Sequence, residues 1–126
     1  MAGSQHDVEQ LLAPMIKKRL YAAVNRRVAA PEAITPYVAD HLRYMTDLEE
    51  RGLLWASGPF VEPGVQVGDG LTILNTATAD EAVTLLRDEP LARRGLRTFD
   101  GPFLWELREG RIPVRLNAST STFRLG

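Results

Sequence analysis

The most constraining feature of this sequence is a pattern that occurs twice: a strand, then a helix, then another strand. Apolar alternation between turn residues predicts strands, and apolar residues at three- and four-residue spacing predict helices. We expect strands over 18–25, 53–57, 71–76 and 96–107, and helices over 36–51 and 78–89. In chain order these segments read β-α-β-β-α-β, which is the order of the ferredoxin-like α+β fold. Two helices would then pack on one face of a four-stranded antiparallel sheet.

Residues at the ends of both helical segments support these bounds. Thr35-Pro36 offers an N-cap hydroxyl followed by proline at the first helical position, and Gly52 suits a left-handed C-terminal cap. Thr78 and Glu81 have the spacing of a capping box, in which each side chain satisfies a backbone donor. Pro90 cannot continue a helix, so it should end the second one.

The sheet should keep one apolar face that the helices leave uncovered. Phe103, Trp105 and Leu107 alternate along the last strand and therefore share one side of it. On the first strand Tyr21 points away from Leu20, and we place Tyr21 on the uncovered face. The commonest partner for such a face is a second copy of the same chain. We therefore expect a homodimer.

Two further segments lie outside the repeated pattern. The stretch 61–70 is rich in glycine and contains a proline, which predicts an exposed loop. The tail over 111–126 carries two short alternating stretches around a polar turn. It can form an extra hairpin or an arm that wraps the partner subunit.

The composition excludes several classes of protein. The chain has no cysteine, which rules out disulfide scaffolds, thiolate catalysis and Cys-ligated metal centres. Its 15 basic and 16 acidic residues are dispersed and give a net charge of −1, so neither nucleic acid nor an anionic membrane is an expected partner. No stretch approaches the roughly 20 apolar residues of a membrane-spanning helix, and residues 1–10 lack the apolar region of a secretory signal. We expect a cytoplasmic protein.

His41 is the most informative single residue. It follows Val38 by three positions and precedes Met45 by four, so helical spacing places it on or beside the apolar stripe of the first helix. An imidazole there is either a core histidine with a polar partner or a general acid/base. Tyr37 and Tyr44 lie four and three residues from His41 and can place hydroxyls beside it, although this spacing is also typical of core residues.

Glu89 is the candidate carboxylate. It lies three residues after Leu86 on the apolar face of the second helix, whereas Asp88 should point toward solvent. Because the helix should end here, Glu89 can equally be a frayed surface corner. Arg93 and Arg94 follow closely and can meet an anionic substrate, although exposed arginines are usually only solvated.

We expect neither a cofactor nor a metal. The glycines lack the spacing of a phosphate-binding loop, and no serine lies in a nucleophile elbow. The chain has only two histidines, His6 and His41, which makes a multi-histidine metal site within one chain improbable.

Several short motifs resemble those of a known family. The stretches DHLRYM over 40–45, LEERGLL over 48–54 and SGP over 57–59 resemble the pattern of the YCII-related family. Downstream, Glu89-Pro90 with Gly95 is similar to the Asp-Pro segment of that family and its following glycine. The resemblance implies a single domain over 1–126. Its core would cover 17–108, with a leader over 1–16 and a C-terminal arm or hairpin over 109–126.

The resemblance also implies a site. In that family the helix histidine pairs with the acid before the proline in a cleft, so His41 would pair with Glu89 or, with a one-residue shift, with Asp88. The catalytic candidates are therefore these three residues. The candidate substrate-binding residues are Tyr37, Tyr44, Ser57, Arg93 and Arg94.

The family belongs to the dimeric α+β barrel group, which includes muconolactone isomerases and dehydrochlorinating enzymes of aromatic breakdown. This implies a cofactor-independent lyase or isomerase of a small cyclic or aromatic-derived metabolite, with His41 as general acid/base. Two alternatives remain on the same fold. One is a non-catalytic module that binds a small molecule, and the other is a haem-dependent or cofactor-free oxygenase.

Overall fold

The computed structural model describes residues 3–64 and 68–125. One compact unit comprises Arg19–Glu106, and the segments before and after it form a second, smaller unit. Each unit is described by itself below. No helix in the described part of the chain is long and apolar enough to cross a membrane.

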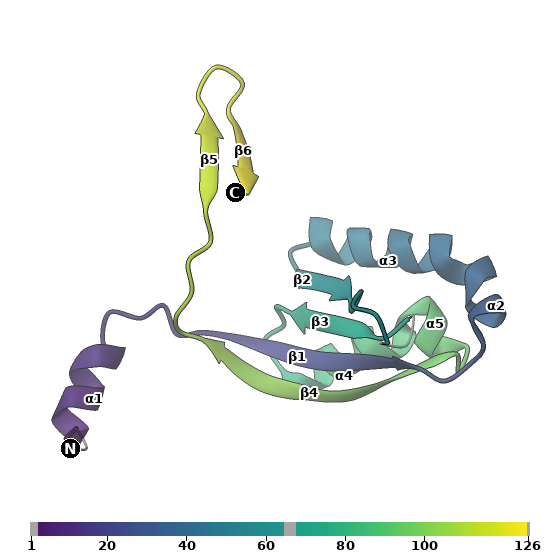
Figure 1. Ribbon diagram of the computed structural model, residues 1–126, viewed down its shortest axis with the longest axis horizontal. Helices are drawn as coiled ribbons and strands as arrows, with labels where there is room; N and C mark the ends of the chain where they lie inside the picture. Colours follow the sequence, from purple (N-terminus) through teal and green to yellow (C-terminus); the bar gives the residue numbers. More distant parts are fainter. Residues whose placement is uncertain (1–2, 65–67, 126) are drawn as a thin grey trace. The chain divides into compact units, whose positions relative to one another are not determined.

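The larger unit is built on a four-stranded sheet (Figure 1). Its strands are β1 (Lys18–Arg27), β2 (Leu54–Pro59), β3 (Gly70–Leu74) and β4 (Arg97–Leu107). The spatial order is β2-β3-β1-β4, and β3 pairs antiparallel with both β1 and β2. The expected ferredoxin-like α+β order of strands is therefore confirmed.

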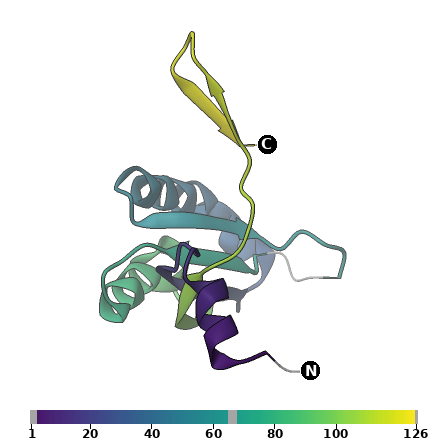
Figure 2. The ribbon, with the colours of Figure 1, turned by 90° about the vertical axis from the view of Figure 1, so that its left-hand side faces the viewer.

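The helices follow the strands in the expected order, with short helical segments added at two corners. The main helices are α3 (Val38–Glu50) and α4 (Ala79–Asp88), which are seen nearly end-on in Figure 2. The additions are α2 (Pro31–Ile34) and the 3₁₀ segment η1 (Thr35–Tyr37) before α3, and α5 (Pro90–Arg93) after α4. Pro90 thus ends α4 as expected and also begins the next helix, which suits its fixed φ.

The helix ends are close to those expected. Gly52 has φ +75° after α3, the left-handed cap that the sequence predicted. Thr78 caps α4 by accepting a hydrogen bond from the Glu81 amide at 3.2 Å. The Thr35 hydroxyl, in contrast, does not cap α3, because it donates to the carbonyl of Pro31 at 3.1 Å.

The core lies between the sheet and the two main helices. Its buried residues are Ala23, Met45, Leu48, Leu74, Ala82 and Leu86. Tyr21, which lies opposite Leu74 in the sheet, packs against this cluster. Our placement of Tyr21 on the uncovered face was wrong. Period-two alternation shows that neighbours face opposite ways, but it does not show which face is covered.

Within the described part of this unit, no helix covers the other face of the sheet. Trp55 in β2 and Trp105 in β4 come from opposite edge strands, yet their rings meet there with centroids 6.4 Å apart in an edge-to-face arrangement. Phe103 is 59%, Trp105 38% and Leu71 36% exposed. The uncovered apolar face that the sequence predicted is therefore present.

Gly101, in the middle of β4, has a backbone conformation that requires glycine. It has φ +105°, and a Cβ atom at this position would lie 2.9 Å from the carbonyl oxygen of Ala22 on the neighbouring strand. Glycine alone avoids both the strained φ and the close contact.

The smaller unit contains one helix and one hairpin. The helix α1 (Gln5–Leu12) begins with a capping box between Ser4 and Asp7. The strands β5 (Val114–Asn117) and β6 (Thr122–Leu125) pair antiparallel, which is the hairpin alternative for the tail. In the loop expected over 61–70, residues 61–64 are exposed, and residues 65–67 lie outside the described part.

Candidate active site

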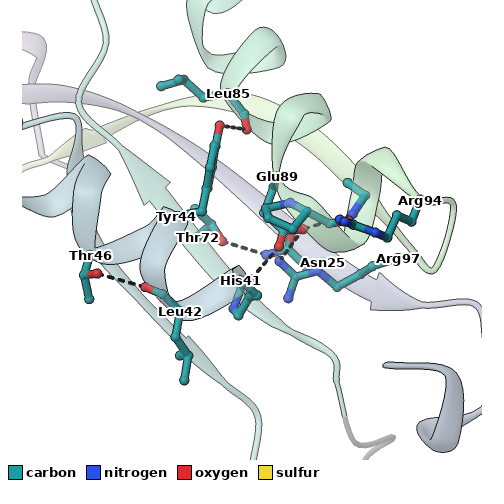
Figure 3. A network of polar contacts seen from close by, with 12 residues as sticks. Asn25, His41, Leu42, Tyr44, Thr46, Thr72, Leu85, Glu89, Arg94 and Arg97 are labelled. Carbon is teal, nitrogen blue, oxygen red and sulfur yellow. Dashed lines mark hydrogen bonds and ion pairs between the residues drawn. The ribbon is translucent and has the colours of Figure 1, made fainter. Parts of the chain in front are cut away.

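A histidine and a carboxylate meet where α3 approaches α5. Nδ1 of His41, in the first turn of α3, lies 2.5 Å from Oε1 of Glu89, which occupies the junction between α4 and α5 (Figure 3). The His41 side chain is 19% exposed and that of Glu89 is 4% exposed. The pair therefore has a buried acid and an imidazole that solvent still reaches.

Glu89 is held by more than the histidine. Its Oε2 atom accepts a hydrogen bond from the amide of Ala92 at 3.0 Å, so the side chain is the N-cap of α5. An Arg97 guanidinium nitrogen lies 3.4 Å from the same oxygen. One carboxylate oxygen thus faces the histidine, while the other is fixed by a backbone amide and a cation.

These contacts keep Glu89 ionised. Burial alone would raise its pKa, but the hydrogen bond from His41, the charge of Arg97 and the amides of Leu91 and Ala92 outweigh burial and lower the pKa below 4.5. An ionised carboxylate only accepts hydrogen bonds, so Nδ1 of His41 carries the shared proton. In neutral imidazole, Nε2 is then the free basic nitrogen.

A small polar cavity lies on the inner side of Glu89. It is lined by Asn25, Thr72, Arg97 and Glu89 together with apolar core residues, and its volume of about 10 Å³ admits a single water at most. The amide of Asn25 donates to the hydroxyl of Thr72 at 2.7 Å, and both side chains are buried. A substrate would therefore reach His41 from its exposed side and not through this cavity.

A family model places the chain among known proteins. The model of the YCII-related domain matches residues 16–99, which include both His41 and Glu89. The chain belongs to the YCII-related family. No curated protein matches the chain significantly in sequence.

A solved structure supports the fold of this YCII-related chain. It is 5-chloro-2-hydroxyhydroquinone dehydrochlorinase from Burkholderia phenoliruptrix AC1100, in complex with 2,5-dihydroxybenzoquinone. The TM-score is 0.51 and the sequence identity 18%, and the match covers 71% of this chain and 95% of the other. At this identity the likeness establishes the α+β fold alone.

Three of the candidate residues of the YCII-related chain make specific internal contacts beside the pair. The hydroxyl of Tyr44 donates to the carbonyl of Leu85 at 2.7 Å, and burial, with the nearby charges of Asp88 and Glu89, raises the pKa of Tyr44 to about 12. Arg94 lies 4.3 Å above the ring of Tyr37 and donates to a backbone carbonyl of α5. The first contact joins α3 to α4, and the second joins η1 to the end of α5.

The side chains of the remaining candidates form no hydrogen bond or ion pair with His41 or Glu89. The Asp88 side chain is exposed and forms no hydrogen bond or ion pair with the residues that the structure describes, and Glu89 is the acid that meets His41. Ser57 is exposed on β2 opposite Thr72, on the sheet face that the helices cover. Arg93 is exposed on α5.

Sequence reasoning missed three polar residues of this site. Asn25 and Thr72 are buried polar side chains in strands, and Arg97 turns inward to Glu89. Asn25 could have been found, because it continues the alternation of Tyr21 and Ala23 on one side of β1. Among the described residues, no group of three or more histidines and carboxylates could hold a metal ion.

Proposed function

We propose that this protein is a lyase or isomerase that moves protons on a small cyclic or aromatic-derived metabolite, without a cofactor, and that His41 is its general acid/base. The observation that carries the proposal is the 2.5 Å contact between Nδ1 of His41 and buried Glu89. A carboxylate on Nδ1 fixes the tautomer and the orientation of the ring, which leaves Nε2 to exchange a proton with substrate.

The chemistry needs no further group on the protein. Nε2 of His41 would accept a proton from a hydroxyl or a carbon of the substrate, and the electron pair of that bond would expel a leaving group or shift along the ring. Glu89 would stabilise the imidazolium that forms, and the same nitrogen would return the proton to the product or to the leaving group. Both elimination and isomerisation follow this course.

The fold neighbour makes elimination a reasonable first class of reaction. It is a dehydrochlorinase of a hydroxylated aromatic ring, and its structure holds a quinone. We therefore propose hydroxylated, ring-bearing metabolites as the first substrates to test.

The decisive experiment compares the two histidines of the chain. Hydroxyquinols, their chlorinated derivatives and unsaturated lactones would be supplied to the wild type, and product formation would be followed by absorbance. His41→Gln should reduce turnover by about 10²-fold or more, the usual scale for a general acid/base. His6→Gln is the matched control, because His6 is exposed on α1 and should have no effect.

The alternative of a non-catalytic binding module gives a different result. If a ring compound such as 2,5-dihydroxybenzoquinone binds saturably but no candidate is converted, the site is a binding module. Equal turnover by the wild type and His41→Gln would contradict the catalytic role of His41 directly.

We also propose that the protein acts as a homodimer. Trp105, Phe103 and Leu71 leave apolar surface open on the helix-free face of the larger unit, and such a face is normally covered. A second copy is the simplest cover, because the face would then bury its own equivalent in an isologous interface.

A further inference from the structure

We propose that an open groove beside the His41–Glu89 pair binds a small carboxylate or phosphate anion. The groove has a volume of about 600 Å³, within the usual range of about 300–1,000 Å³ for small-molecule sites. It is lined by the end of α4, by α5 and by the start of β4. The lining residues are Arg87, Ala92, Arg93, Arg97, Thr98 and Phe99.

The charge of this lining favours an anion. Three of the six residues are arginines, and none of the six is acidic. Arg87 and Arg93 are exposed, and neither side chain forms a hydrogen bond or ion pair with any residue that the structure describes. Planar guanidinium groups match the oxygens of carboxylate and phosphate in a two-point geometry, so the groove offers donors that no protein acid has taken.

Arg97 gives the groove a partly buried cation as well as the two exposed ones. Its side chain is only 11% exposed, and its Nε is buried without a hydrogen-bond partner among the described residues. Burial lowers the pKa of Arg97, although the negative charges of Glu89 and Asp69 oppose this shift. The residue stays charged. Because a guanidinium has five N–H donors, the 3.4 Å contact with Glu89 leaves donors for a second anion.

The groove adjoins Glu89, the partner of His41. Ala92 and Arg97 both line the groove, and the same two residues contact Oε2 of Glu89. An anion in the groove would therefore share Arg97 with Glu89. This binding is separate from the proposed reaction, because it needs neither turnover nor the imidazole of His41.

The site can be located by NMR without a known substrate. The wild-type protein would be titrated with inorganic phosphate and, separately, with benzoate, while sodium chloride keeps the ionic strength constant. We expect saturable shifts concentrated at the amides of Ala92, Arg93, Thr98 and Phe99. Stronger binding of phosphate would indicate a phosphorylated ligand, and stronger binding of benzoate a carboxylated ring.

A double variant tests whether the arginines are responsible. Arg87→Gln combined with Arg93→Gln should weaken binding by about tenfold, because two charge-assisted contacts are lost. Arg43→Gln is the matched control, since it removes an exposed arginine of α3 that pairs with Asp40 outside the groove. Circular dichroism would check that the variants stay folded. Shifts that do not saturate, that occur equally with chloride, or that persist unchanged in the double variant would overturn the proposal.

Discussion

The Oε1 atom of Glu89 lies 2.5 Å from Nδ1 of His41, although 48 residues separate the two in the chain. The contact joins the first turn of α3 to the junction of α4 and α5, so it forms only when both helical segments are packed on the sheet. Changes at either residue should therefore be measurable in stability as well as in activity.

Replacing Glu89 by glutamine should destabilise the protein in a pH-dependent way. The pKa of Glu89 is lower in the folded chain than its ordinary 4.5, so its contribution to stability is present at neutral pH and is lost as the pH falls through the folded-state value. At neutral pH, Glu89→Gln should lower the free energy of unfolding by about 2 kcal/mol, because charge-assisted hydrogen bonds are lost. Urea denaturation between about pH 7 and pH 2 would measure the difference.

The matched control for that change is Asp88→Asn, because Asp88 is adjacent and exposed. It should change stability by less than about 0.5 kcal/mol at every pH. The wild type and Glu89→Gln can instead differ in the free energy of unfolding by the same amount down to the lowest pH. That result would show that the charge of Glu89 does not contribute to stability.

Arg97 should be needed for stability more than the exposed arginines are. Arg97→Met removes the cation beside a buried carboxylate and should lower the free energy of unfolding by about 3 kcal/mol. Arg97→Lys keeps the charge and should recover part of this loss, although not the guanidinium geometry. Arg43→Met, which breaks an exposed ion pair, should cost less than about 1 kcal/mol. Equal losses for Arg97→Met and Arg43→Met would exclude a structural role for the inner ion pair.

Gly101 should tolerate no side chain. Gly101→Ala places a Cβ 2.9 Å from the carbonyl oxygen of Ala22 at a φ of +105°, and we expect a loss of about 2 kcal/mol or more in thermal or urea unfolding. Gly58→Ala is the control, because Gly58 has no positive φ and a Cβ there meets nothing within 4 Å. The idea fails if the two variants are equally stable.

The proposed dimer can be tested by light scattering. The wild type should show twice the mass of one chain at micromolar concentration. Leu71→Lys places a charge on the helix-free face and should shift the mass toward that of a monomer. Val61→Lys is the control, because Val61 is 86% exposed in the loop after β2. A wild-type chain that remains monomeric would refute the dimer.

The order of elements could be predicted from the sequence because each one carries local signals. The Thr78 N-cap and the left-handed Gly52 fix helix ends through contacts within a few residues. Which face of β1 the helices cover was not predictable, since Leu20 and Tyr21 are both apolar and alternation alone is symmetrical. That choice depends on packing between distant segments.

The candidate site was predictable in part, for a similar reason. Helical spacing indicated that His41 lies near the core and that Glu89 shares the apolar face of the second helix. It did not decide whether Glu89 turns inward or forms a frayed surface corner, because this depends on where α4 ends. In the structure Glu89 ends α4 and caps α5, which turns it inward. The inward turn of Arg97 follows from that carboxylate and has no signal in the local sequence.

The contact between Trp55 and Trp105 has a practical consequence for spectroscopy. The chain contains only these two tryptophans, and both indoles lie on the helix-free face of the sheet. Because indole emission moves to shorter wavelength when water is excluded, the intrinsic fluorescence of the native protein reports on that one surface. Dilution alone, with no label and no substitution, would therefore follow the wetting of the sheet if the proposed dimer separates.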